Sequence, residues 1–311
     1  MMAVAALVFA SCNKENEPAS VIKCSTEKLI EENEDEAKVY LQNNQVVFET
    51  GDVVALYNVD DVTPANSVCG MYTATTTGSS NVPFSSTSPL ANDRMSAFYA
   101  FYPGDDVDYT QLDNGNRCGF PLNPVQIYRP NAVPQGALYM AAKDATTDHL
   151  TDAHFHFKNI CGILSLNLYN ASGKTIKKIR VTDKHFHLTG LVQLILPEID
   201  PDELTGMFNN YNESNATYMD NLANYKTRIG YNVTNAGMSV TLNLGEGVAL
   251  GKTKANATRF YMVLRPLALM KGCIIEVTQD GTTWTEIVNS NKDNRIRPSV
   301  IKNMSAINVN I

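Results

Sequence analysis

The sequence has few of the features that mark an enzyme or a nucleic-acid-binding protein. Its 311 residues contain no G-x-S-x-G segment, no CxxC pair and no Cys/His spacing typical of a zinc site. The 25 Lys and Arg residues are outnumbered by 32 Asp and Glu residues, and no basic cluster interleaves with aromatic residues. We therefore expect no catalysis, no cofactor and no nucleic acid partner.

Long apolar runs are also missing, because no stretch reaches the roughly 18 residues that a membrane-spanning helix needs. The opening residues MMAVAALVFAS have the length and the small-residue ending of a signal-peptide core. The segment Phe9-Ala10-Ser11-Cys12 is similar to a bacterial lipobox, in which Cys12 is lipidated and becomes the mature N-terminus. Since no Lys or Arg precedes this run, we expect a start codon further upstream. The alternative is a buried N-terminal strand or helix.

Polar sequence follows Cys12, with NKENEPAS and then an acidic run over residues 27–38. This composition predicts a solvated tether between the membrane and the folded body. The five remaining cysteines are dispersed and odd in number, which argues against a disulfide framework, although one bridge stays open. We expect most of them to be small buried hydrophobic residues: Cys24, Cys69, Cys118, Cys161 and Cys273.

Helical periodicity is almost absent, and alternation of apolar and polar residues with period two predicts an all-β fold. MSVTLNL (residues 238–244) alternates cleanly, and IIEVTQDGTTWTEI (residues 274–287) predicts a hairpin about a type I′ turn at Asp280-Gly281. QVVFETGDVVALYN (residues 45–58) predicts two strands. We expect loops or solvated edge strands over residues 73–89, a loop over residues 245–253, and short helices only at residues 202–208 and 218–225.

The apolar pattern lapses over residues 143–152, and we place a domain boundary there. The sequence then divides into a lipoprotein signal peptide with its lipobox (residues 1–12), a polar tether with an N-terminal strand (residues 13–40), an N-terminal β-sandwich domain (residues 41–148) and a C-terminal β-sandwich domain (residues 149–311).

In order and spacing, these landmarks resemble the fimbrillin-like surface lipoproteins of Bacteroidetes, which are related to the major and minor fimbrial subunits. The resemblance spans most of the chain and rests on SCNKENEP, FETGDVVALYN, FYAFYPG, ALYMAAKD, FHFKNICGILSLNLYN, FYMVLRP, IIEVTQDG and INVNI. One departure is Asn159, where the family usually has His.

The resemblance implies two tandem transthyretin-like β-sandwich domains with few short helices, and a lipid-anchored protein of the outer membrane and cell surface or fimbrium. It also implies assembly by donor-strand exchange, in which a neighbour's strand fills a groove left by a lost N-terminal strand. The partners would be other fimbrial subunits or copies of this chain, and a host or bacterial surface receptor. Ile307, Val309 and Ile311 form a strand that is either donated or completes its own sheet.

A second departure concerns maturation. Polymerising members of the family are cleaved after an arginine near the N-terminus, whereas the first arginine here is Arg94. This favours an anchor, tip, accessory or stand-alone adhesion role over a shaft role. The alternative function is a lipid-anchored glycan-binding protein, which the single tryptophan disfavours and the 14 tyrosines keep open.

The motif HFH occurs twice, and in a strand its two imidazoles share one face. If a turn at Ser172-Gly173 paired the two segments, four imidazoles would come within reach of Zn²⁺ or Ni²⁺. The alternative, which we favour, is that they are solvated side chains on polar strand faces, so we assign no metal site. The residues concerned are His154, His156, His185 and His187.

Overall fold

The structure is a computed structural model. It describes residues 21–32, 46–58, 70–89, 98–106, 117–134, 136–144, 150, 153–195, 229–232, 237–266 and 268–311. The predicted all-β fold is confirmed, since the elements in these ranges are strands apart from one 3₁₀ helix, Lys254–Asn256. No helix in them is long and apolar enough to span a membrane. The two predicted short helices, residues 202–208 and 218–225, lie outside these ranges.

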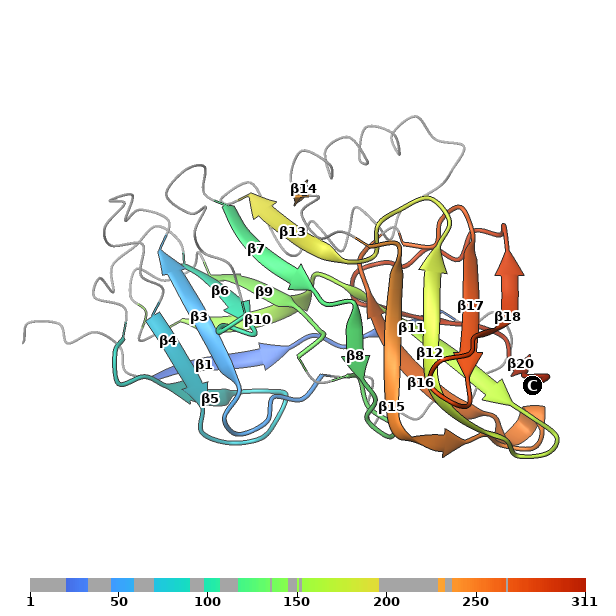
Figure 1. The fold of residues 1–311 in the computed structure, drawn as a ribbon. Helices are drawn as coiled ribbons and strands as arrows, with labels where there is room; N and C mark the ends of the chain where they lie inside the picture. Colours follow the sequence, from blue (N-terminus) through green and yellow to red (C-terminus); the bar gives the residue numbers. More distant parts are fainter. Residues whose placement is uncertain are drawn as a thin grey trace, which may run out of the picture.

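Seven strands from the first half of the chain form a closed barrel, drawn mainly in blue and green in Figure 1. All neighbouring strands pair antiparallel except β1 and β10, which are parallel. In pairing order the strands are β1 (Val21–Thr26), β10 (His154–Asn159), β9 (Met140–Asp144), β6 (Phe98–Tyr102), β3 (Val53–Asn58), β4 (Gly70–Ala74) and β5 (Val82–Ser85).

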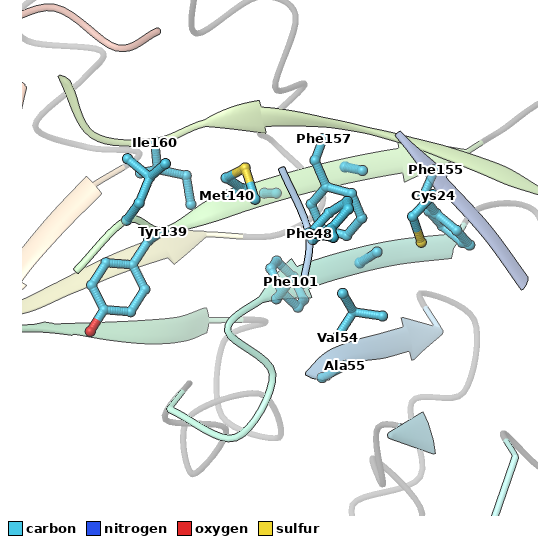
Figure 2. Packing of buried hydrophobic residues seen from close by; sticks show 14 of the residues in the cluster. Cys24, Phe48, Val54, Ala55, Phe101, Tyr139, Met140, Phe155, Phe157 and Ile160 are labelled. Carbon is cyan, nitrogen blue, oxygen red and sulfur yellow. The ribbon is translucent and has the colours of Figure 1, made fainter. Parts of the chain in front are cut away.

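Aromatic side chains fill the barrel around Phe48, which is fully buried (Figure 2). The Phe48 ring makes edge-on contacts with Phe84, Tyr102 and Phe157 at centroid distances of 5.1, 5.5 and 5.5 Å. Edge-to-face pairs of this kind stabilise a core beyond their buried area. Phe48 thereby links three of the barrel strands, although its own segment contributes only an isolated bridge to Gly78.

The second half of the chain, together with two short strands from the first half, forms a β-sandwich of two sheets around a separate hydrophobic core. The inner sheet pairs β16 (Thr258–Leu264), β11 (Gly162–Tyr169), β19 (Val300–Asn303) and β2 (Ile30–Glu32), and β20 (Ile307–Asn308) also pairs with β11. The strands of the outer sheet lie side by side in Figure 1. In pairing order they are β18 (Thr285–Ser290), β17 (Cys273–Thr278), β12 (Thr175–Asp183), β15 (Ser239–Ala249) and β8 (Val125–Ile127).

A small third sheet consists of β14 (Ile229–Asn232), β13 (Gly190–Ile195) and β7 (Arg117–Leu122). From β7, Phe120 packs against Phe101 of β6 and against Tyr139, with centroid distances of 5.9 and 5.3 Å. This contact buries aromatic side chains on the outside of the barrel, so the barrel has apolar residues on both of its surfaces there.

The inner sheet of the sandwich is shared by the two cores. Leu164, Leu166 and Phe260 belong to the sandwich core, whereas Ile163, Val263 and Ile301 belong to the core that includes the barrel. Because successive side chains of a strand point to opposite faces, one sheet can serve both cores. The barrel and the sandwich therefore pack on a common hydrophobic layer.

The N-terminal domain differs from the predicted sandwich, because its strands close into a ring. The sequence shows the strands but not which of them meet, and closure depends on β1 pairing with both β5 and β10. The transthyretin-like assignment of the two domains stays a prediction.

Local predictions had mixed outcomes. The predicted β17–β18 hairpin is confirmed, but its connection is longer than a two-residue turn, and of Asp280 and Gly281 only the glycine has a positive φ, +89°. Strand β5 lies in residues 73–89, where we expect loops or solvated edge strands, and β15 continues to Ala249, into the expected loop over residues 245–253. Gly245 and Gly247 have φ of +64° and +114° within that strand, beside a register shift in its pairing with β12, so the strand bulges and continues.

We expect Phe48→Ala to lower the free energy of unfolding by about 3–5 kcal/mol, because it removes a buried ring from a close-packed core. Phe48→Leu keeps most of the volume and should lose less than half as much. Equilibrium urea denaturation checks both variants. A loss below about 1 kcal/mol for Phe48→Ala would mean that the barrel does not depend on this aromatic cluster.

Candidate strand-addition site

Strand β1 closes the barrel by lying between β5 and β10. It pairs antiparallel with β5, from Val21↔Ser85 to Cys24↔Val82, and parallel with β10, from Lys23↔His154 to Thr26↔Phe157. Without β1 the ring would end in two open strand edges, on β5 and β10. Unpaired edges of this kind accept another strand. The position between β5 and β10 that β1 occupies, which we call the β1 slot, is therefore a candidate strand-addition site.

The alternating sequence of β1 explains why one face of the strand is buried in the barrel. Ile22 and Cys24 alternate with Val21 and Lys23, and only the first pair is buried. Cys24 lies beside Phe155 in the barrel interior (Figure 2), its neighbour in the β1–β10 register. A strand with this alternation buries one row of side chains while its backbone pairs on both edges.

Glu27, immediately after β1, is buried and accepts several hydrogen bonds at the junction of barrel and sandwich. Its Oε1 accepts the backbone N–H of Asn159 at 2.6 Å and the Asn159 Nδ2 at 3.0 Å, and it also accepts the Ser299 hydroxyl. Its Oε2 lies 3.7 Å from the Lys158 ammonium group. Glu27 thus connects the N-terminal segment, the end of β10 and the segment leading into β19.

The chain then enters the sandwich. Leu29 is buried, and β2 pairs in parallel with β19, from Val300↔Ile30 to Lys302↔Glu32. One short N-terminal segment therefore supplies a strand to each half of the molecule.

The acidic run containing Glu27 predicted a solvated tether, and for Glu27 this is wrong, because the carboxylate is buried among hydrogen-bond donors. The sequence offers no local sign of this, since its partners lie 131 to 272 residues away.

Three of the five cysteines predicted to be small buried residues agree with that prediction. Cys24, Cys161 and Cys273 are buried and free. Burial raises the pKa of the Cys161 thiol to about 12 and that of Cys273 to about 11, and it raises the pKa of Cys24 further above its ordinary value. Cys12, the predicted lipidation site, and Cys69 lie outside the described residues, as does the side chain of Cys118 in β7.

The candidate donated strand lies in the chain's own inner sheet. Ile307 pairs with Leu168 in parallel, the Val309 N–H donates to the Tyr169 carbonyl at 2.8 Å, and Val309 is fully buried. Ile307 and Ile311 pack against the same core. The structure therefore corresponds to the alternative in which these residues complete their own sheet.

The four histidines lie in two places. His154 and His156 are on β10, where the His156 Nδ1 is 2.9 Å from the Ser25 hydroxyl oxygen, and His185 and His187 follow β12. The hairpin that would join them does not form, because β11 and β12 belong to different sheets. Within the described ranges no three His, Cys, Asp or Glu side chains converge as metal ligands.

Comparison with known proteins gives structural similarity only. No family model and no curated protein sequence matches the chain. A candidate cell adhesion protein from Bacteroides uniformis is similar, with 12% identity, a TM-score of 0.49, and 83% of this chain and 88% of that chain covered. One from Bacteroides ovatus has 11% identity, a TM-score of 0.47 and coverages of 94% and 95%.

A fimbrial protein from Bacteroides ovatus is also similar, with 13% identity, a TM-score of 0.39, and coverage of 94% of this chain and 50% of that chain.

We expect Glu27→Ala to lower the free energy of unfolding by about 3 kcal/mol, because buried donors of Asn159 and Ser299 lose their acceptor. Glu27→Gln keeps one carbonyl oxygen and should cost clearly less. Glu286→Ala, an exposed carboxylate on β18, serves as the control and should stay within about 0.5 kcal/mol of the unchanged chain. Equal effects of Glu27→Ala and Glu286→Ala in urea titrations would contradict the role of Glu27.

Cys24 should resist alkylation in the folded chain, because the thiolate is the reactive species and burial both raises its pKa and blocks access. Iodoacetamide at pH 8, followed by mass spectrometry of the Cys24 peptide, should find label only after denaturation. Labelling of Cys24 in the native chain at the rate of the unfolded chain would show that β1 is not seated in the barrel.

Proposed function

We propose that this protein is a cell-surface adhesion or fimbrial subunit, anchored in the outer membrane by a lipid on Cys12 and assembled by β-strand addition. It acts as an anchor, tip or accessory subunit, and its partners are other fimbrial subunits, or further copies of itself, and a surface receptor. The resemblance of its sequence landmarks to fimbrillin-like lipoproteins motivates this proposal.

One observation carries the proposal: a short N-terminal strand occupies a slot between two strands from elsewhere in the chain. The β1–β10 pair is the only parallel pair in the ring, and it joins residues more than 130 positions apart. The slot is apolar, because Phe155 of β10 and Phe84 of β5 are fully buried beside Cys24 and Ile22 of β1. Removal of the N-terminal segment would expose an elongated apolar groove with backbone donors and acceptors on both sides, as strand addition requires.

The positions of the lysines and arginines determine which proteases could cleave off the N-terminal segment and open this groove. The residues before Arg94 offer only lysines, among them Lys23 within β1 and Lys28 between β1 and β2. A chain that keeps its N-terminal segment stays attached through Cys12 with the slot filled. This supports an anchored or accessory role, and a different protease would be needed for a shaft role.

The test is to open the slot deliberately. A chain with a specific protease site inserted within residues 33–45 is cleaved, so that β1 and β2 are held only by non-covalent contacts. We expect slow loss of the N-terminal fragment and a ladder of oligomers on a non-reducing gel, while the uncut chain stays monomeric. An excess of a synthetic peptide of residues 21–32 should suppress the ladder by refilling the slot.

The matched control is a peptide with the same residues in scrambled order, which should leave the ladder unchanged. A cleaved chain that releases its N-terminal fragment and remains monomeric would contradict assembly by strand exchange. A ladder that the native peptide does not suppress would show that oligomers form at another surface.

A further inference from the structure

The exposed face of the outer sheet carries the only tryptophan of the chain. On this sheet Ile179, Val181 and Ile275 point into the sandwich core, so the residues between them point outward. In register order, Arg180 lies beside Glu276, and Glu276 lies beside Glu286. Trp284 immediately precedes β18 and has the same parity as Glu286, which places its side chain on this outward face.

The tryptophan is held in a fixed position. The Arg180 guanidinium carbon lies 4.2 Å from the centroid of the Trp284 ring, and the Arg180 Nε donates to a Glu276 carboxylate oxygen at 2.7 Å. The Lys178 ammonium group donates to the Gly281 carbonyl at 3.0 Å, which fastens the loop that carries the ring. Trp284 is half-buried, so part of the ring stays open to solvent while Arg180 stacks on it.

Polar side chains of β12 and β15 occupy the middle of the face. Thr241 and Asn243 of β15 lie next to Arg180 and Lys178, and the hydroxyl oxygens of Thr182 and Ser239 are 2.7 Å apart. At the far edge, Val125 and Ile127 of β8 are 51% and 59% exposed. Five strands at a spacing of about 4.8 Å give a surface about 19 Å wide.

Around Trp284 the charges are paired. Lys178 and Arg180 are matched by Glu276 and Glu286, and Arg180 and Glu276 form an ion pair. The further cation, Lys184, lies past the end of β12 and donates to Asn289 and Asn291. The part of the face around Trp284 therefore offers little net attraction to an acidic or a basic partner. An aromatic ring fixed at one end, hydroxyl and amide groups in the middle and aliphatic side chains at the other end suit a ligand that is uncharged, extended and amphipathic.

We propose that this face, defined by Trp284, Arg180, Thr241, Asn243, Val125 and Ile127, binds an uncharged glycan chain. The Trp284 ring stacks on the C–H face of one sugar ring, and hydroxyl and amide side chains of β15 hydrogen-bond with sugar hydroxyls. This inference rests on the cell-surface location given under the proposed function. It deepens that function by assigning the adhesion partner to one chemical class, uncharged glycans. The glycan face is on the sandwich and is separate from the β1 slot in the barrel.

The sole tryptophan makes this site directly observable. The full chain is first applied to a printed array of neutral and acidic glycans, and we expect binding to neutral glycans only. The soluble form of the glycan bound is then titrated while tryptophan emission is followed, and saturation should shift the emission and protect the ring from iodide quenching. Because the chain has one tryptophan, any such change reports Trp284 alone.

Variants separate binding at this face from binding elsewhere. Trp284→Ala should weaken binding by about tenfold or more in calorimetry, and Trp284→Tyr, which keeps an aromatic ring, should lose less. Lys254→Ala, an exposed residue of the 3₁₀ helix, is the control and should bind unchanged. If Trp284→Ala does not fold, Thr241→Glu places a charge in the middle of the face without touching the core, and it should also abolish binding.

A silent array would overturn the inference, as would binding that survives both Trp284→Ala and Thr241→Glu or that comes only from acidic glycans. None of these outcomes bears on strand exchange, which the cleavage experiment reads independently. A ladder of oligomers together with a silent array would leave the proposed function intact and remove the glycan face.

Discussion

The pairing of β1 with both β5 and β10 is the constraint on which the first half of the molecule depends. A ring of strands has no open edge only while every neighbour is present, and here one member comes from the N-terminal segment. Its backbone satisfies donors and acceptors on two sides, and its buried residues Ile22 and Cys24 complete an aromatic core. Few residues therefore control whether the barrel is closed.

The same segment also links the two halves of the chain. After β1 the buried Glu27 carboxylate gathers donors from the end of β10 and from Ser299, and β2 then adds a strand to the sandwich. The inner sheet contributes side chains to both cores, so the halves share a hydrophobic layer. Loss of the N-terminal segment would consequently affect the barrel slot, the junction and the edge of β19 together.

Much of the strand content could be predicted from the sequence, because alternation along β15 and β17 reflects burial of one face. Closure of the barrel could not, since it depends on pairing between residues 23 and 154, far apart in the chain. The burial of Glu27 could not be predicted either, because its acidic neighbours in the sequence indicated a solvent-exposed segment. Nor could the separation of the two histidine pairs, which follows from β11 and β12 lying in different sheets. Trp284 was visible in the sequence, whereas its stacking on Arg180 required the register of three strands.

Two surfaces on different halves of the chain follow from this arrangement: a slot that holds a strand, and an exposed sheet face that carries Trp284. The slot is central, and hydrogen–deuterium exchange of the intact chain tests it most directly. The account predicts that the amides of residues 22–26 exchange as slowly as those of β3 and β6 in the same barrel. Complete exchange of these amides within seconds, while β3 and β6 stay protected, would contradict it.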